Sequence, residues 1–170
     1  MKKALALIVC AALSARQVQD FVLLAQHDNW DVWVIATPNA RAFIDQSSLT
    51  RLTDHPVTVD TPTLPLPEFG AAVVVPATFN TIRKWSQGIA DTYALTLLLE
   101  WMRQASFPVL VFPRASSELA QDPAFTPSLA HLQQQGVLVH YRPDLYPPNN
   151  NIPWTDILQA LRDADNGQIS

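Results

Sequence analysis

A short apolar run that ends abruptly in polar residues is the feature that most restricts how this chain can fold. Ala71–Val75 is uninterrupted apolar sequence, which predicts a buried strand. Because proline has no N–H for a sheet ladder, we expect the strand to stop at Pro76. Thr78, Asn80 and Thr81 come next, where a helical pattern begins. Polar side chains just past the carboxyl end of a strand lie where open α/β sheets bind ligands.

Strand-like runs alternate with helix-like patterns along the rest of the chain. Further strands are expected at Ala4–Cys10, Asp31–Ala36, Pro56–Val59, Val109–Phe112 and Val137–His140. Helices are expected from Ser14 and over Arg41–Asp45, Ser48–Thr53, Asn80–Gln87, Thr92–Gln104, Pro127–Gln135 and Trp154–Ala164. This alternation predicts a mostly parallel sheet, and continuous apolar strands indicate helices on both of its faces.

We therefore expect a single-domain, three-layer α/β protein with a Rossmann- or flavodoxin-like fold. Residues 1–145 are predicted to form its ligand-binding body. Residues 146–170 are predicted to be a proline-rich connector and a C-terminal helix that packs on the same domain.

The composition argues against several classes of protein. The 170 residues are 48% hydrophobic and 15% charged, which is typical of a packed core. A net charge of −4 and the lack of a long basic run argue against nucleic-acid binding. The single cysteine, Cys10, excludes an internal disulfide and a cysteine-based zinc site, and no metal is expected.

The N-terminal segment admits two interpretations. Residues 1–15 combine two lysines, an apolar run and small residues, as a signal peptide does. The same residues predict a buried first strand with Lys2 and Lys3 in solvent. We favour the strand, because the α/β pattern loses its central strand without it and the run is too short to span a membrane. A cytoplasmic protein that does not bind membranes is therefore expected.

The third strand–helix turn resembles a known family. Residues 76–81, Pro-Ala-Thr-Phe-Asn-Thr, are similar to the Pro-Ala-Ser/Thr-Ala-Asn-Thr motif of the flavin-containing cysteine decarboxylases, which include phosphopantothenoylcysteine decarboxylase. Residues 88–91, Gly-Ile-Ala-Asp, follow at the family's spacing, and the resemblance covers about Leu5 to Val139. It implies an FMN cofactor, a small-molecule substrate, and a homotrimer or a multiple of trimers with FMN between subunits. Phe79 and Trp85 are the apolar candidates for that subunit boundary.

The resemblance assigns candidate ligand residues to three turns. In the first turn the family's glycines are absent, and Ser14 remains as a phosphate ligand or as a plain helix cap. In the second, Thr37 before Pro38 has the same two interpretations. In the third, Asn80 is expected to hold the substrate carboxylate, or only to cap its helix. The predicted cofactor-binding residues are Ser14, Thr37, Pro76, Ala77, Thr78, Asn80 and Thr81.

Other positions depart from the family pattern. The decarboxylases carry a His-Ile segment upstream of the flavin strand, where residues 62–64 are Pro-Thr-Leu. Their substrate clamp, Pro-x-Met-Asn-x-x-Met-Trp, corresponds to residues 113–120, in which Met, Asn and Trp are all missing. Arg114 instead resembles the Pro-Arg pair of flavin prenyltransferases, whose arginine meets a phosphate. A solvent-exposed arginine at the end of a strand is the competing interpretation.

Three functions stay open on these grounds. The first is an FMN-dependent oxidoreductase or decarboxylase-like enzyme for a small thiol or carboxylate substrate, with Asn80 and Arg114 as catalytic candidates. The second is a non-catalytic flavin-binding regulatory subunit, which the missing histidine and clamp favour. The third is a flavin prenyltransferase-like enzyme that uses Arg114.

Overall fold

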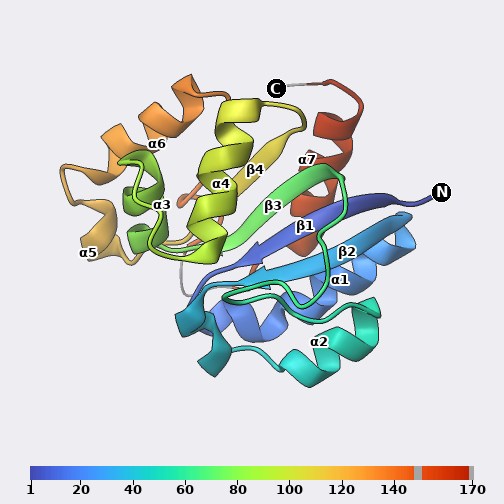
Figure 1. Cartoon of the computed structure of the whole chain (residues 1–170). Coiled ribbons are helices and arrows are strands. Elements are labelled where there is room, and N and C mark those ends of the chain that lie inside the picture. The colour runs from blue at the N-terminus through green and yellow to red at the C-terminus, as the bar shows by residue number, and fades with distance from the viewer. Residues whose placement is uncertain (148–150, 169–170) are drawn as a thin grey trace.

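The computed structural model describes residues 1–147 and 151–168, which form a five-stranded sheet between two layers of helices (Figure 1). The strands are β1 (Lys3–Val9), β2 (Trp30–Ala36), β3 (Phe69–Ala77), β4 (Val109–Pro113) and β5 (Leu138–Val139). The α-helices are α1 (Val18–His27), α2 (Gln46–Thr53), α3 (Phe79–Ser86), α4 (Tyr93–Gln104), α5 (Ser117–Ala120), α6 (Phe125–Gln134) and α7 (Trp154–Asp165). Two 3-10 helices, η1 (Leu13–Gln17) and η2 (Pro38–Ala42), follow β1 and β2.

All paired strands are parallel, in the order β2-β1-β3-β4-β5. The predicted three-layer, Rossmann- or flavodoxin-like α/β fold is therefore confirmed. Residues Ala4–Val9 of β1 are all buried, because the strand lies between β2 and β3 and helices cover both faces of the sheet. Parallel strands end at the same edge, so the turns after β1, β2 and β3 are neighbours.

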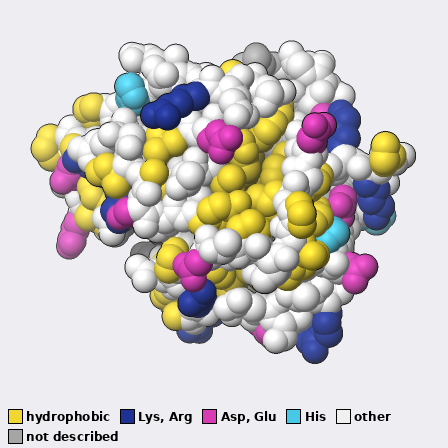
Figure 2. Space-filling model, viewed as in Figure 1, with side chains coloured by type: hydrophobic (Ala, Val, Ile, Leu, Met, Phe, Trp, Pro, Cys, Tyr) yellow, Lys and Arg dark blue, Asp and Glu magenta, His cyan; other side chains and the backbone are white. Residues whose placement is uncertain are grey.

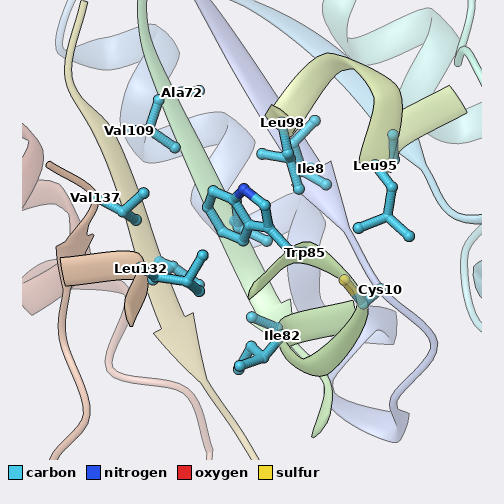
Figure 3. Close-up of a cluster of buried hydrophobic side chains, with 14 of the residues drawn as sticks. Ile8, Cys10, Ala72, Ile82, Trp85, Leu95, Leu98, Val109, Leu132 and Val137 are labelled. Carbon is cyan, nitrogen blue, oxygen red and sulfur yellow. The ribbon is translucent and has the colours of Figure 1, made fainter. Parts of the chain in front are cut away.

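Two apolar clusters fill the space on either side of the sheet. Alternate strand residues point to opposite faces, so Ile8 and Val74 belong to one cluster while Leu7 and Val73 belong to the other. Helices α3, α4 and α6 cover the first face, and α1 and α7 cover the second. On the first face, Trp85 of α3 lies among the side chains of its neighbours and is fully buried (Figure 3).

The apolar spacing of α1 predicts its buried face correctly. Val18, Phe21, Val22 and Ala25 fall on one side of the helix, and all four are buried. Phe21 also stacks on Trp154 of α7, with ring centroids 6.0 Å apart. The C-terminal helix is thus anchored on α1, against the same face of the sheet.

Four predicted elements differ in the structure. The helix expected over Arg41–Asp45 is replaced by the 3-10 helix η2, which covers Pro38–Ala42. The chain after β1 forms the 3-10 helix η1 before α1 begins, rather than one helix from Ser14. Pro56–Val59 contributes a single bridge, between Thr58 and Ile35 on the edge strand β2, rather than a strand. Strand β3 does not stop at Pro76 but runs to Ala77. The ladder with β4 shifts register between Val74 and Ala77, and the shift accommodates a residue with no N–H.

No helix in residues 1–147 and 151–168 is long and apolar enough to cross a membrane.

Candidate functional site at three turns

The three turns predicted from the sequence meet at the carboxyl edge of β1, β2 and β3. Backbone hydrogen bonds join them directly. The Thr37 N–H donates to the Val9 carbonyl at 3.0 Å, and the Cys10 N–H donates to the Pro76 carbonyl at 3.2 Å. The segments after the three strands therefore have fixed positions relative to one another.

The first turn carries Ser14 inside η1, where its side chain is half-buried. The residue at the N-cap of η1 is Ala12, which has no side-chain oxygen to cap with. The interpretation of Ser14 as a plain N-cap is therefore wrong. Leu13, where the family has a glycine-rich turn, is 70% exposed and points away from the core.

The second turn places Thr37 at the N-cap of η2, with Pro38 directly after it, as the sequence predicts. The Thr37 side chain is nearly buried, at 8% exposure, yet makes no capping hydrogen bond. Although Thr37 occupies the N-cap position, its hydroxyl therefore does not cap the helix. Its position beside the first turn is suited to a hydrogen bond with a ligand.

The third turn is organised by threonines. Thr78 is the N-cap of α3, and its hydroxyl oxygen accepts from the Thr81 N–H at 3.5 Å. The Thr78 hydroxyl in turn donates to the Thr81 hydroxyl oxygen at 3.2 Å. Asn80 is exposed inside the first turn of α3, so the interpretation of Asn80 as the helix cap is wrong. Its amide is available to a ligand above the sheet edge.

Cys10 precedes the first turn and contacts residues of the third turn. Its side chain is fully buried, and burial raises the pKa of the thiol, while hydrogen bonds with Thr81 and Thr78 oppose that rise. The raised pKa favours the neutral thiol, and the side chain packs in the core as a small apolar group. The sequence predicted Cys10 only as the last residue of the first strand, and its contact with the threonines could be found only from the fold.

Arg114 follows β4 at the same edge of the sheet. Its backbone N–H donates to the Ala77 carbonyl at 2.9 Å, and its Nη2 donates to the Pro147 carbonyl at 3.1 Å. The side chain is half-buried, so the interpretation as a solvent-exposed arginine is wrong, and burial lowers the pKa of its guanidinium. The structure thus brings Arg114 beside the third turn, just past the end of β4, the strand next to β3.

Comparison with known proteins identifies the family. A profile of the Flavoprotein family matches residues 1–164. The chain belongs to the Flavoprotein family. The match covers nearly the whole chain, including all three turns and most of α7. No curated protein matches the chain.

Several solved structures share the fold. The FMN-dependent cysteine decarboxylase SpaF is 21% identical, with a TM-score of 0.78 over 95% of this chain and 97% of its own. HAL3 from Cryptococcus neoformans is 20% identical, with a TM-score of 0.76 over 99% of both chains. A PPC decarboxylase mutant complexed with pantothenoylaminoethenethiol is 16% identical, with a TM-score of 0.75 over 95% and 97%. These similarities confirm the predicted resemblance to flavoproteins of the decarboxylase type.

Residues 1–147 and 151–168 contain no group of three or more His, Cys, Asp or Glu side chains that could hold a metal ion.

One side chain that the motifs did not single out, His140, lies near Arg114. It follows β5 and stacks on Phe112 of β4, with ring centroids 4.9 Å apart and planes within 12°. Burial lowers the pKa of His140, and the carboxylate of Asp163 opposes that change. The imidazole is therefore neutral in the folded protein at pH 7. No motif surrounds His140, so sequence reasoning could not associate it with Arg114.

The lowered pKa of His140 predicts how stability depends on pH. The unfolded chain takes up a proton near pH 6.5, whereas the folded chain resists it to a lower pH. The free energy of unfolding should therefore fall as the pH drops below about 6.5. Urea unfolding between pH 8 and pH 5 measures this slope. The His140→Asn variant should lose less stability over the same range; an identical slope would contradict the assignment.

Proposed function

We propose that this chain binds FMN at the three turns and is an FMN-dependent oxidoreductase or decarboxylase-like enzyme for a small thiol or carboxylate substrate. The observation that carries the proposal is the fixed arrangement of Ser14, Thr37 and the 76–81 turn beside one another at the sheet edge. Membership of the Flavoprotein family and similarity to FMN-dependent cysteine decarboxylases support the choice of cofactor.

The residues at the three turns suit the two ends of FMN. The Thr37 hydroxyl, which makes no capping hydrogen bond, would hold the phosphate together with Ser14 and backbone N–H groups at the start of η1. The flavin ring would lie against Pro76–Thr81, where small side chains leave the backbone accessible. When bound, FMN supplies redox chemistry that side chains lack, while the protein contributes binding and orientation.

Two residues are proposed to handle the substrate. Asn80 is exposed past the end of β3, and its amide can donate two hydrogen bonds to a carboxylate. Arg114, on the neighbouring strand end, supplies a fixed positive charge. Because these groups come from different turns, a substrate between them would be oriented at both ends.

The missing histidine and clamp favour a second function, a non-catalytic flavin-binding regulatory subunit. The position of Arg114 would also suit a flavin prenyltransferase-like enzyme. Anaerobic mixing of the FMN-loaded protein with a small thiol carboxylate, such as a peptide ending in cysteine, separates the first two functions. An enzyme of the proposed type should reduce bound FMN and bleach its absorbance, whereas a regulatory subunit should leave it oxidised.

Flavin binding itself is tested by titration. The purified protein should be yellow and should quench the fluorescence of added FMN. Riboflavin, which lacks the phosphate, should bind at least about tenfold more weakly, because charged hydrogen bonds to the phosphate are lost. FAD is the control for a larger nucleotide. A colourless protein that takes up no added FMN would contradict the proposal.

The proposal includes assembly as a homotrimer or a multiple of trimers. Figure 2 shows hydrophobic side chains gathered between α4 and the segment that leads into β3, and Leu64 in that segment is 50% exposed. An apolar patch of this kind is typical of a protein interface. Phe79 is half-buried and could contribute to a boundary, but Trp85 is fully buried, so its expected place there is wrong.

Light scattering tests the assembly. The FMN-loaded protein should have about three times, or a multiple of three times, the chain mass of 18.9 kDa. Replacing Leu64 with aspartate should shift the distribution toward monomer, because a charge buried at an interface is unfavourable. An FMN-loaded wild-type monomer at micromolar concentration would refute this part of the proposal.

A cytoplasmic location also belongs to the proposal. Its support is that Ala4–Val9, the run that resembles the apolar part of a signal peptide, is buried at the centre of the sheet.

A further inference from the structure

Three aromatic side chains meet at the end of the sheet opposite the three turns. Phe69 begins β3, Trp101 lies in the last turn of α4, and Phe107 comes shortly before β4. Because the strands are parallel, the amino ends of β3 and β4 lie together, and the carboxyl end of α4 leads into the same edge (Figure 1). The ring centroid of Trp101 is 5.5 Å from that of Phe69 and from that of Phe107, and the two phenylalanine centroids are 6.4 Å apart.

The three rings stand at steep angles to one another, so they form a corner rather than a stack. The angles between their planes are 70°, 66° and 62°, an edge-to-face arrangement. This aromatic corner borders a hollow of about 480 Å³, whose other described lining residues are Pro67, Glu68, Gln104 and Ser106. Phe69 and Phe107 are only partly buried, so a ligand in the hollow can contact them without rearrangement of the fold. Trp101 is buried and anchors the corner in the core.

The charges around the hollow favour a cation. Glu68 is the one charged residue among the described lining residues; it is exposed and forms no ion pair with a described residue. Helix α4 ends at this edge, where Ala105 takes a left-handed conformation with φ 49°, and the carboxyl end of a helix carries partial negative charge. Arg103, in the last turn of α4, is exposed and does not line the hollow. Aromatic rings add to this preference, because their faces attract cations.

The polar groups at the hollow restrict the kind of cation. The described side chains that line it offer oxygen acceptors only from Glu68, Gln104 and Ser106. A primary ammonium carries three N–H donors that need acceptors, whereas a methylated ammonium presents methyl groups that aromatic rings contact favourably. An apolar cavity of about 150 Å³ accommodates benzene. A hollow of about 480 Å³ therefore has room for a cation of the size of choline.

We propose that this hollow binds a small, free organic cation with a methylated ammonium head group. The head group would lie against the aromatic corner, and the Glu68 carboxylate would balance its charge from the edge of the hollow. Leu64, the residue chosen above to test assembly, does not line the hollow. Because the hollow and the three turns lie at opposite ends of the sheet, binding of the cation requires neither FMN nor the proposed enzyme activity.

Calorimetric titration of the full chain with choline tests the site. The matched control is dimethylbutanol, the tert-butyl analogue in which carbon replaces the charged nitrogen. Choline should bind, and dimethylbutanol should bind at least about fivefold more weakly, because a neutral group gains no attraction from the ring faces or the carboxylate. Ethanolamine, with a primary ammonium, should also bind more weakly than choline. No binding of choline at millimolar concentration, or equal binding of either control compound, would overturn the proposal.

The lipid phosphatidylcholine carries the same head group as choline. A protein that takes only the free cation should not float with phosphatidylcholine vesicles in a density gradient. Flotation with these vesicles would overturn the assignment to a free cation.

Two substitutions locate the binding. Phe107→Leu keeps an apolar side chain but removes a ring, and it should weaken choline about twofold to fivefold while it changes dimethylbutanol little. Glu68→Gln keeps the shape of an exposed side chain and should weaken choline by a similar factor of about two to five. Glu118→Gln, a change at an exposed carboxylate of α5, should leave choline binding unaltered. Unchanged choline affinity in Glu68→Gln would overturn the location even if Phe107→Leu did not fold.

Discussion

Replacing Trp85 with alanine should lower the free energy of unfolding by about 3–5 kcal/mol, among the largest losses that one core truncation causes. Trp85 of α3 is the largest of the fully buried side chains in the described residues, and it packs against α4, α6 and the sheet (Figure 3). Its removal leaves a hole that neighbours such as Leu98 and Leu132 cannot fill without moving. Urea or guanidinium unfolding of both proteins measures the difference.

The indole nitrogen of Trp85 provides the matched control. Its N–H is buried and has no hydrogen-bond partner among the described residues. An unsatisfied buried donor costs about 1–3 kcal/mol, so Trp85→Phe removes that cost while it loses part of the ring's contacts. Because the two effects oppose each other, the phenylalanine variant should lose less than half of what the alanine variant loses. A loss equal to that of Trp85→Ala would mean that the N–H is satisfied in the folded protein.

Trp85 also illustrates what sequence patterns alone could not determine. Its place in a helix near the motif was consistent with either the core or a subunit boundary. The choice depends on which face of α3 meets α6, and α6 lies some forty residues further along the chain. By contrast, the central strands were predictable, because a continuous apolar run has few alternatives once both faces of a sheet are covered.

The errors in the predicted elements have local physical causes. Pro76 was expected to end β3, but the prediction allowed only for its missing N–H and not for the shift in register that accommodates it. The short helix α5 (Ser117–Ala120) was not predicted, since four residues carry too little periodicity to detect. Ser14 was expected to begin a helix, but the chain forms a 3-10 turn first.

The polar residues of the candidate site were predictable from the sequence, but a cavity beside Arg114 was not. Thr37 and Thr78 each follow a strand directly, and Asn80 lies two residues beyond Thr78, so the parallel topology alone brings them to one edge. The cavity at Arg114 instead combines β3, β4, the segment that follows β5, and α7. Its lining residues are up to 85 positions apart, as with Val75 and Ala160, and no local motif connects them.

Replacing Thr37 with valine should weaken FMN binding by about 1.5–3 kcal/mol, or roughly 10- to 150-fold. The substitution keeps the shape of the side chain and removes only the hydroxyl. Thr37 is nearly buried and its hydroxyl makes no capping hydrogen bond, so the fold itself should lose little. The expected loss is a charged hydrogen bond to the phosphate, and fluorescence titration with FMN measures it.

Three controls test whether the loss of FMN affinity in Thr37→Val comes from a lost hydrogen bond to the phosphate. Thr37→Ser retains the hydroxyl and should bind FMN nearly as tightly as wild type. Riboflavin has no phosphate, so its affinity should be the same for Thr37→Val and wild type. Asn80→Ala should keep most of the FMN affinity while it weakens any carboxylate ligand, because Asn80 is exposed beyond the turn and its amide is proposed to meet the substrate. If Thr37→Val binds FMN as tightly as wild type, Thr37 only begins a helix, and the phosphate must lie elsewhere on the sheet edge.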